Sequence, residues 1–190
     1  MAVYNDFNSE VADLVRMKKV GVVPTDTIYG VIGSALDCGV VKKIYEIKNR
    51  DESKPVIVLV GSEDQIRRNF NIDVPEKVSR IWPVKLSVIL DCEKYPHIHR
   101  GSKKIAFRIP DNCRLVEFLL RVGPIVAPSA NPQGLRPAQS IREAKNYFGE
   151  RVDFYLDGGF QKSKASTVIE WKKEGFEVVR EGAVNSKFLR

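Results

Sequence analysis

Short apolar runs, rich in β-branched residues, alternate with amphipathic segments in the first part of this chain. Residues 20–23 and 56–60 are bounded by proline or glycine and are typical of buried strands. Between them, Asp37 can cap a helix whose apolar residues share one side: Val40, Val41, Ile44 and Ile47. This alternation of strand and helix restricts the chain to folds in which helices cover a sheet.

Other helix starts follow the same rules. Asn8 or Ser9 can cap a helix that has acids at its start and bases at its end, which suits the helix dipole. Capping boxes at residues 62–65 and 140–143 predict two more helices, the second ending at Gly149.

The pattern changes after residue 85, where predicted strands follow one another more often. Strands are expected at residues 86–90, 105–109, 125–127, 152–156, 166–171 and 176–180, with a helix near residues 114–121. Because helices alternate with strands early and strands succeed one another late, we predict an α/β fold with a mixed parallel and antiparallel sheet. No repeat or linker divides the chain, so residues 1–190 are expected to form a single domain.

Charge and composition limit the class of protein. The formal net charge of +7 favours anionic partners such as nucleotides, phosphates or RNA. No apolar run approaches the roughly 18 residues of a membrane helix, and residues 1–10 do not resemble a signal peptide. Three scattered cysteines favour a reducing compartment and structural, partly buried thiols. We therefore expect a cytoplasmic protein without membrane contact.

Several common catalytic motifs are absent from the sequence. It contains no P-loop, no G-x-G-x-x-G, no H-E-x-x-H and no G-x-S-x-G. The two histidines, His97 and His99, have no nearby acid or cysteine pair, and a surface loop is the simplest interpretation of "YPHIHR". These absences disfavour hydrolytic covalent catalysis, and no dedicated metal site is visible.

Polar clusters do occur where predicted strands and helices end. In "VPTDTIYG", the hydroxyls of Thr25 and Thr27 can bind a small polar ligand or simply close a turn. Lys48, Arg50 and Lys54 gather after a helix, where they can cap its carbonyl end or grip a polyphosphate; the sequence leaves both interpretations open.

Arg108 lies within the apolar run of "KKIAFRIPDN". A cation there is costly unless it is paired or binds a carboxylate or phosphate, and an edge strand facing water is the alternative. The remaining clusters are weaker when taken alone. They are the proline-rich turn "VAPSANPQGLRP", the strand start "SKASTVIEW" and the strand end "VVREGAV".

In this order, the clusters resemble the YrdC/TsaC family of threonylcarbamoyl-AMP synthases over residues 20 to 184. The resemblance rests on "PTDTIYG", "KNR" followed by "KP", "IAFRIPD", "APSANPQG", "ASTVIE" and "VVREGA". It implies a twisted, open mixed sheet flanked by helices around a large basic cavity. It also implies an enzyme that converts L-threonine, bicarbonate and ATP to threonylcarbamoyl-AMP and pyrophosphate, for modification of tRNA beside the anticodon.

The resemblance also implies roles for particular residues. Lys48 and Arg50 would be catalytic and hold ATP phosphates. Threonine would contact Thr25, Thr27, Arg108, Ser129 and Ser166. ATP would further contact Lys54, Asn131, Gln139, Ser140 and Arg180. Mg2+ is expected with the triphosphate, and a tRNA-threonylcarbamoyl transferase is the expected partner, with direct tRNA binding also possible. The alternatives are a non-catalytic RNA-binding module of the same fold and a related carbamoyl-adenylate enzyme.

The chain departs from the family pattern at several positions. Lys85 interrupts "WPVKLS" where many relatives have a Gly-Pro turn, and Lys104 replaces a small residue, often threonine, which would alter a usual ATP contact. Leu59 stands where some relatives carry a histidine. Longer relatives have an additional C-terminal domain that is not expected in this chain.

Overall fold

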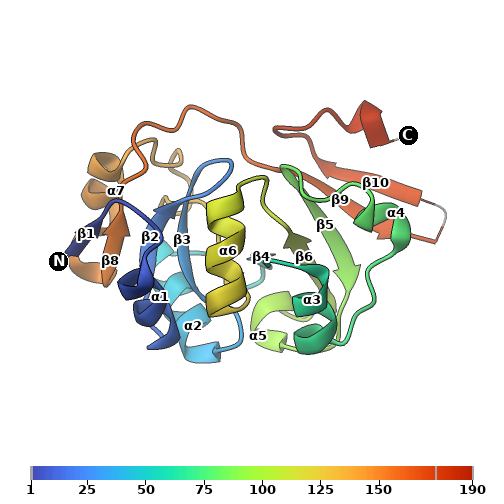
Figure 1. The fold of residues 1–190 in the computed structure, drawn as a ribbon, viewed down its shortest axis with the longest axis horizontal. Coiled ribbons are helices and arrows are strands. Elements are labelled where there is room, and N and C mark those ends of the chain that lie inside the picture. The colour runs from blue at the N-terminus through green and yellow to red at the C-terminus, as the bar shows by residue number, and fades with distance from the viewer. Residues whose placement is uncertain (1, 174, 190) are drawn as a thin grey trace.

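The computed structural model of the chain describes residues 2–173 and 175–189, and its centre is a ten-stranded sheet (Figure 1). The strand order within the described residues is β1-β8-β2-β3-β7-β4-β6-β5-β9-β10. The strands are β1 (Ala2–Tyr4), β2 (Gly21–Pro24), β3 (Tyr29–Ser34), β4 (Ile57–Leu59), β5 (Leu86–Asp91), β6 (Lys104–Arg108), β7 (Ile125–Val126), β8 (Phe154–Leu156), β9 (Thr167–Lys172) and β10 (Gly175–Arg180).

Strand pairing confirms the predicted mixed sheet. β8 pairs in parallel with β1 and β2, β4 with β6, and β5 with β9. The pairs β2–β3, β3–β7, β4–β7, β5–β6 and β9–β10 are antiparallel. A long connection between β8 and β9 runs across the top of the molecule and joins its two halves (Figure 1).

Four helices begin where side-chain caps were predicted. Asn8, Asp37, Ser62 and Ser140 each accept a backbone N–H at a helix start. Neither capping box closes as expected, because Gln65 and Glu143 accept the N–H of the residue before the cap, Gly61 or Gln139. The helices are α1 (Ser9–Arg16), α2 (Cys38–Lys48), α3 (Glu63–Phe70), α4 (Glu76–Ser79), α5 (Pro96–His99), α6 (Cys113–Val122) and α7 (Ile141–Phe148), with 3-10 turns η1 (Gly149–Arg151) and η2 (Ser186–Leu189).

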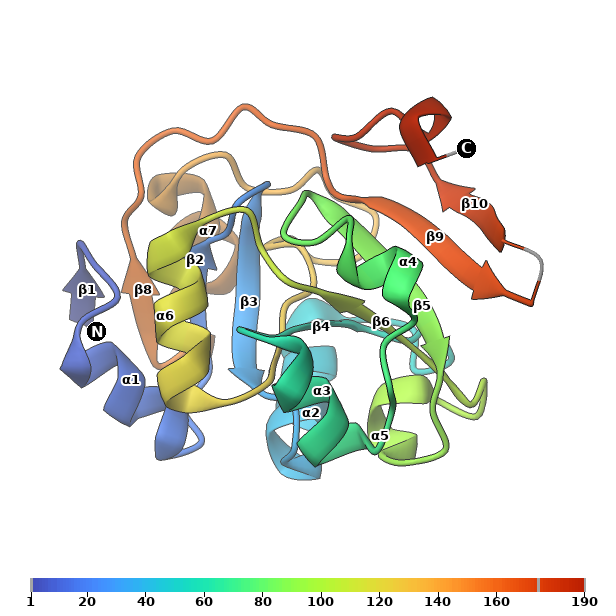
Figure 2. The same ribbon diagram turned by 45° about the vertical axis from the view of Figure 1, so that its right-hand side comes forward.

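The apolar core divides between the two faces of the sheet. Neighbouring residues of one strand, such as Val22 and Val23 or Val58 and Leu59, enter different clusters because side chains alternate along a strand. α2 supplies one cluster, while α1 and α6 supply the other. α1 packs on α6, and both lie on the same side of β3 (Figure 2).

The sequence did not predict β1, β3, α4 or α5. Two glycines lower the strand propensity of β3, yet Gly33 is needed there, since a Cβ atom would lie 2.4 Å from Cγ1 of Val40 on α2. The expected surface loop around the histidines was wrong. Residues 96–99 form α5, and His99 is 5% exposed, with its Nδ1 satisfied by the N–H groups of Gly101 and Lys103.

The cysteines are all free, but only Cys92 is buried, while Cys38 and Cys113 are exposed; the expectation of partly buried thiols was therefore wrong for these two. Within residues 2–173 and 175–189, no helix has the length and apolar character needed to cross a membrane.

Candidate functional site

A cavity of about 700 Å³ opens over β6, β5 and β9 and brings together residues from most of the predicted clusters. Its size is within the range of about 300–1,000 Å³ that is common for small-molecule sites. Predicted residues that line it are Thr25, Thr27, Arg50, Arg108, Ser129, Ser166 and Arg180.

The other predicted site residues do not line this cavity. Lys48 is buried beside it, Lys54 is exposed with its ammonium 3.7 Å from Asp51, and Asn131 is 9% exposed. Gln139 precedes α7 and Ser140 caps it. Ser140 lines a second, smaller hollow of about 500 Å³ between α7 and the residues that follow β8.

The turn after β2 holds two threonine hydroxyls close together. Thr25 closes the turn with its backbone N–H and its hydroxyl, both of which donate to the carbonyl of Ile28. The Thr25 and Thr27 Oγ1 atoms are 3.0 Å apart, and Thr25 Oγ1 also accepts the Thr27 N–H. This network fixes both hydroxyls at the wall of the cavity.

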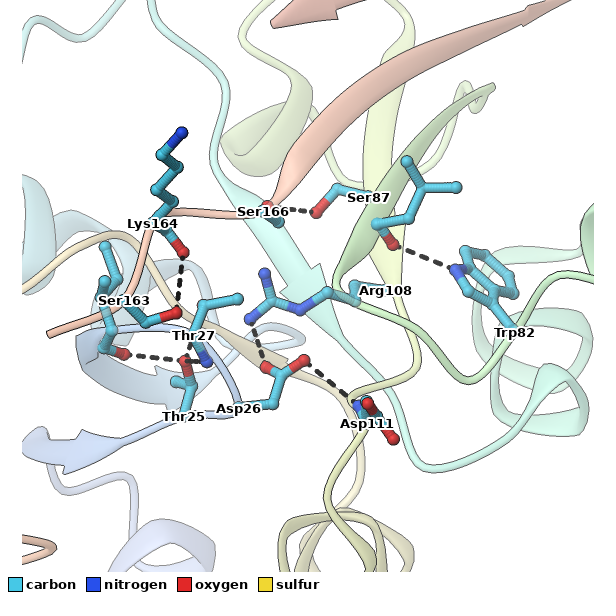
Figure 3. A network of polar contacts seen from close by, with 12 residues as sticks. Thr25, Asp26, Thr27, Trp82, Ser87, Arg108, Asp111, Ser163, Lys164 and Ser166 are labelled. Atoms are coloured by element: carbon cyan, nitrogen blue, oxygen red, sulfur yellow. Dashed lines mark hydrogen bonds and ion pairs between the residues drawn. The ribbon is translucent and has the colours of Figure 1, made fainter. Parts of the chain in front are cut away.

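Arg108 faces the same turn from β6 (Figure 3). β6 lies between β4 and β5, so the edge-strand alternative for this residue was wrong. Its side chain is 5% exposed, and its Nη2 lies 3.0 Å from Oδ1 of Asp26, whose own side chain is fully buried. Burial lowers the pKa of the Arg108 guanidinium, and the charge of Asp26 opposes that shift.

Asp26 is the site residue that the sequence reasoning missed. A signal was present, since a cation inside a strand needs a counter-ion and "PTDT" supplies a carboxylate at a strand end. Nothing in the sequence fixed which acid would reach Arg108, because β2 and β6 are far apart along the chain.

Ser166 is held at the start of β9 by two neighbours. Its Oγ lies 3.0 Å from Oγ of Ser87 on β5 (Figure 3), and Nη2 of Arg180 donates to its carbonyl at 2.8 Å. Burial lowers the pKa of Arg180. Arg108 and Arg180 therefore place two guanidinium groups at one end of the cavity.

Lys48 lies under the Ser129–Asn131 turn. Its Nζ donates to the carbonyls of Ser129 and Asn131, and the Lys48 carbonyl accepts the N–H of Gln133. Burial, and less strongly the charge of Arg50, lower the pKa of Lys48 to about 7. Lys48, the last residue of α2, thus connects this helix to the Ser129–Asn131 turn.

Arg50 reaches the cavity just beyond α2. Its Nη2 donates to the carbonyl of Pro55 at 2.8 Å, and its guanidinium lies 5.7 Å from the centre of the Tyr45 ring. In the parallel register of β4 and β6, Ile57 is opposite Ala106, so Pro55 is close to the level of Lys104. Arg50 and Lys104 therefore lie at the end of the cavity away from Arg108.

The three positions at which the chain departs from the family pattern differ in their surroundings. Lys104 forms an ion pair with Glu170, and both line the cavity. Lys85 accepts the N–H of Thr167 through its carbonyl, so this loop supports the start of β9. Leu59 is fully buried in the core and does not face the cavity.

Comparison with known proteins agrees with the motifs. The Sua5/YciO/YrdC family model, described as "Telomere recombination", matches residues 13–182. The chain is 32% identical over 159 residues to the threonylcarbamoyl-AMP synthase of Bacillus subtilis, covering 80% of this chain and 46% of that protein. It is 32% identical over 171 residues to a putative threonylcarbamoyl-AMP synthase of Methanocaldococcus jannaschii, covering 87% and 81%.

A solved structure shares the fold over nearly the whole chain. Sua5 of P. abyssi complexed with L-threonine superposes with a TM-score of 0.88 at 27% identity, covering 99% of this chain and 59% of that one.

The fold is an open mixed α/β sheet flanked by helices, and its cavity is lined by both polar and apolar side chains. The chain belongs to the Sua5/YciO/YrdC family, as its motifs predicted. It spans about half the length of the B. subtilis relative and about four-fifths of the M. jannaschii relative.

Proposed function

We propose that this chain is a threonylcarbamoyl-AMP synthase, which converts L-threonine, bicarbonate and ATP to threonylcarbamoyl-AMP, pyrophosphate and water. The observation that carries the proposal is the gathering of seven predicted residues, from clusters spread between residues 25 and 180, around one cavity. Relatives named threonylcarbamoyl-AMP synthase and the threonine complex of Sua5 support it.

The chemistry requires positioning and charge, not an enzyme nucleophile. Bicarbonate loses a C–O bond as water to give CO2, and the amine nitrogen of threonine bonds to the CO2 carbon and releases a proton, which leaves a carbamate. A carbamate oxygen then attacks the α-phosphorus of ATP, and the bond to the bridging oxygen breaks, so pyrophosphate leaves with that electron pair. Holding the reactants together can supply on the order of 7–11 kcal/mol, and fixed cations stabilise the charge of the transition state.

The two ends of the cavity suit the two substrates. We propose that Arg108 binds the threonine carboxylate, with Thr25, Thr27, Ser129 and Ser166 around the amino acid. At the other end Arg50 would hold ATP phosphates. Roles in ATP binding for Lys48, Lys54, Asn131, Gln139, Ser140 and Arg180 remain predictions.

We expect Mg2+ to enter with the triphosphate and offset its charge. Glu170 is the one carboxylate among the described lining residues, and it is paired with Lys104. The described lining therefore offers the ion one carboxylate ligand at most. The product would pass to a tRNA-threonylcarbamoyl transferase that modifies adenosine beside the anticodon.

The test is threonine-dependent release of pyrophosphate from ATP and bicarbonate, without tRNA. Arg50→Ala should lower kcat/KM at least tenfold, because a phosphate-binding cation is lost from the cavity wall. Arg67→Ala is the matched control, since Arg67 is exposed and pairs with Asp73 on the surface. Both variants should keep the wild-type circular dichroism spectrum.

Three results would contradict the proposal. Wild-type protein that releases no pyrophosphate at any Mg2+ concentration is not this synthase. Salt-sensitive tRNA binding without ATP binding would favour an RNA-binding module. Turnover with carbamoyl phosphate in place of threonine and bicarbonate would favour a related carbamoyl-adenylate enzyme.

A further inference from the structure

Asp26 is a fully buried carboxylate at the amino-acid end of the cavity, yet it does not line the cavity itself. One oxygen, Oδ2, accepts the backbone N–H of Asp111 at 3.2 Å. The other, Oδ1, lies 3.0 Å from Nη2 of Arg108 (Figure 3). A buried carboxylate is costly without compensation, so its position between Thr25 and Thr27 calls for a role.

The contact between Asp26 and Arg108 leaves hydrogen-bonding capacity unused. Nη2 is close to Oδ1, but its N–H is not aligned on that oxygen, so the pair is held by charge. Nε of Arg108 is also buried without a hydrogen-bond partner among the described residues. A guanidinium prefers two parallel N–H contacts to one carboxylate, and Arg108 lacks such a partner in the described structure.

The charges at this end of the cavity do not cancel. Arg108 and Arg180 contribute two positive charges, and Asp26 offsets one of them. Glu170 pairs with Lys104 at the other end of the cavity. Lys104 is four residues from Arg108 along β6, or about 13 Å in an extended strand. One uncompensated positive charge is therefore left beside Thr25, Thr27 and Ser166.

We propose that Asp26 is a positioning residue that holds the Arg108 guanidinium in the orientation needed by a substrate carboxylate. The inference rests on the proposed function, in which Arg108 binds the threonine carboxylate. It adds that Asp26 orients Arg108 for this contact. With Asp26 in place, Nη2 of Arg108 faces the turn after β2. Its Nε–H has no partner in the described structure and can donate to a substrate carboxylate. Without Asp26, no carboxylate holds the Arg108 guanidinium toward the turn, and repulsion by the Arg180 guanidinium can displace it from the position that binds the substrate.

The test compares binding of L-threonine with binding of L-threoninol, which lacks the carboxylate. In wild-type protein, calorimetry should show at least tenfold tighter binding of threonine. Asp26→Asn keeps the size of the side chain but removes its charge, and should weaken threonine binding at least tenfold while changing threoninol binding less than threefold. Asp91→Asn, at an exposed carboxylate on the end of β5, should change neither.

In the pyrophosphate assay, Asp26→Asn should raise the KM for threonine and leave the KM for ATP within threefold. If Asp26 had a purely structural role, Asp26→Asn would raise the KM for threonine and the KM for ATP together. That result would overturn the proposal. Retention of full threonine selectivity by Asp26→Asn would overturn it as well.

A second variant covers the case in which Asp26→Asn does not fold. Asp26→Asn with Arg108→Gln removes both charges of the pair and should fold, binding threonine no better than threoninol. If the double variant also failed to fold, or folded and kept the wild-type selectivity, the positioning role would be wrong. Wild-type protein that binds neither ligand would instead contradict the proposed function, so the two failures are distinguishable.

Discussion

At the scale of single residues, the sequence showed which cations are unusual but not what they touch. Arg108 stood out because it interrupts an apolar run, and the structure shows it buried in the middle of the sheet. Its counter-ion Asp26 was not predicted, since a partner 82 positions away cannot be deduced from local pattern. Lys48 was predicted to grip phosphate, whereas its Nζ contacts in the structure are two backbone carbonyls.

Lys48 should give the protein a distinctive dependence of stability on pH. Its folded pKa is lowered to about 7, below the ordinary value of 10.5, so the unfolded chain binds more protons between these values. The free energy of unfolding should therefore rise with pH from about 7 to 10.5, by up to about 1.4 kcal/mol per pH unit. Below pH 7 both states carry the proton, and the contribution is constant.

Urea unfolding at several pH values checks this prediction against Lys48→Met, which should lack that rise. Lys42→Met, at an exposed lysine that pairs with Glu46 on the same helix, should behave like wild type. Parallel pH curves for wild type and Lys48→Met would show that Lys48 does not titrate in this range. The Lys48 variant should also lower turnover, because the Ser129–Asn131 turn loses both Nζ contacts.

At the scale of elements, caps and strand runs were predictable because the signals that set them are local. Asn8, Asp37, Ser62 and Ser140 cap helices as their sequences indicated. β3 was missed because one of its glycines, Gly33, allows the close approach of α2, a tertiary contact that local propensity opposes. The same applies to the segment after β10, whose role depends on packing against the start of β9.

Gly182, in the motif "VVREGA", makes that packing possible. A Cβ atom there would lie 2.3 Å from the Ala165 carbonyl oxygen and 2.5 Å from backbone atoms of Ser166. Gly182→Ala should therefore lower the free energy of unfolding by about 1–3 kcal/mol, as overpacking typically does. Because Ser166 lines the cavity, the KM for threonine should rise too.

Denaturant unfolding and pyrophosphate release measure the two effects. Gly39→Ala, at an exposed position within α2, provides the matched control and should stay within about 1 kcal/mol of wild type. Unchanged stability and KM in Gly182→Ala would mean that residues 181–184 do not hold the start of β9.

At the scale of the whole molecule, the cavity is a product of topology. The turn after β2 comes from one half of the sheet, while β5, β6, β9 and β10 form the other half (Figures 1 and 2). The sequence alone could not bring these segments together, because the pairings β4–β6, β4–β7 and β5–β9 join strands that are distant along the chain. The resemblance of the ordered motifs to the YrdC/TsaC family did indicate that these segments contribute to one site.

This arrangement predicts how ligands should act on the two halves. Amide hydrogen exchange with saturating L-threonine and a non-hydrolysable ATP analogue should slow in the turn 25–30, in β6 and at residues 165–170. These segments line the cavity in different parts of the sheet. No described residue of α1 or β1 lines the cavity, so these elements should exchange as in the free protein. Threonine alone should protect the turn 25–30, and protection confined to the hollow beside α7 would place the ligands at a different site.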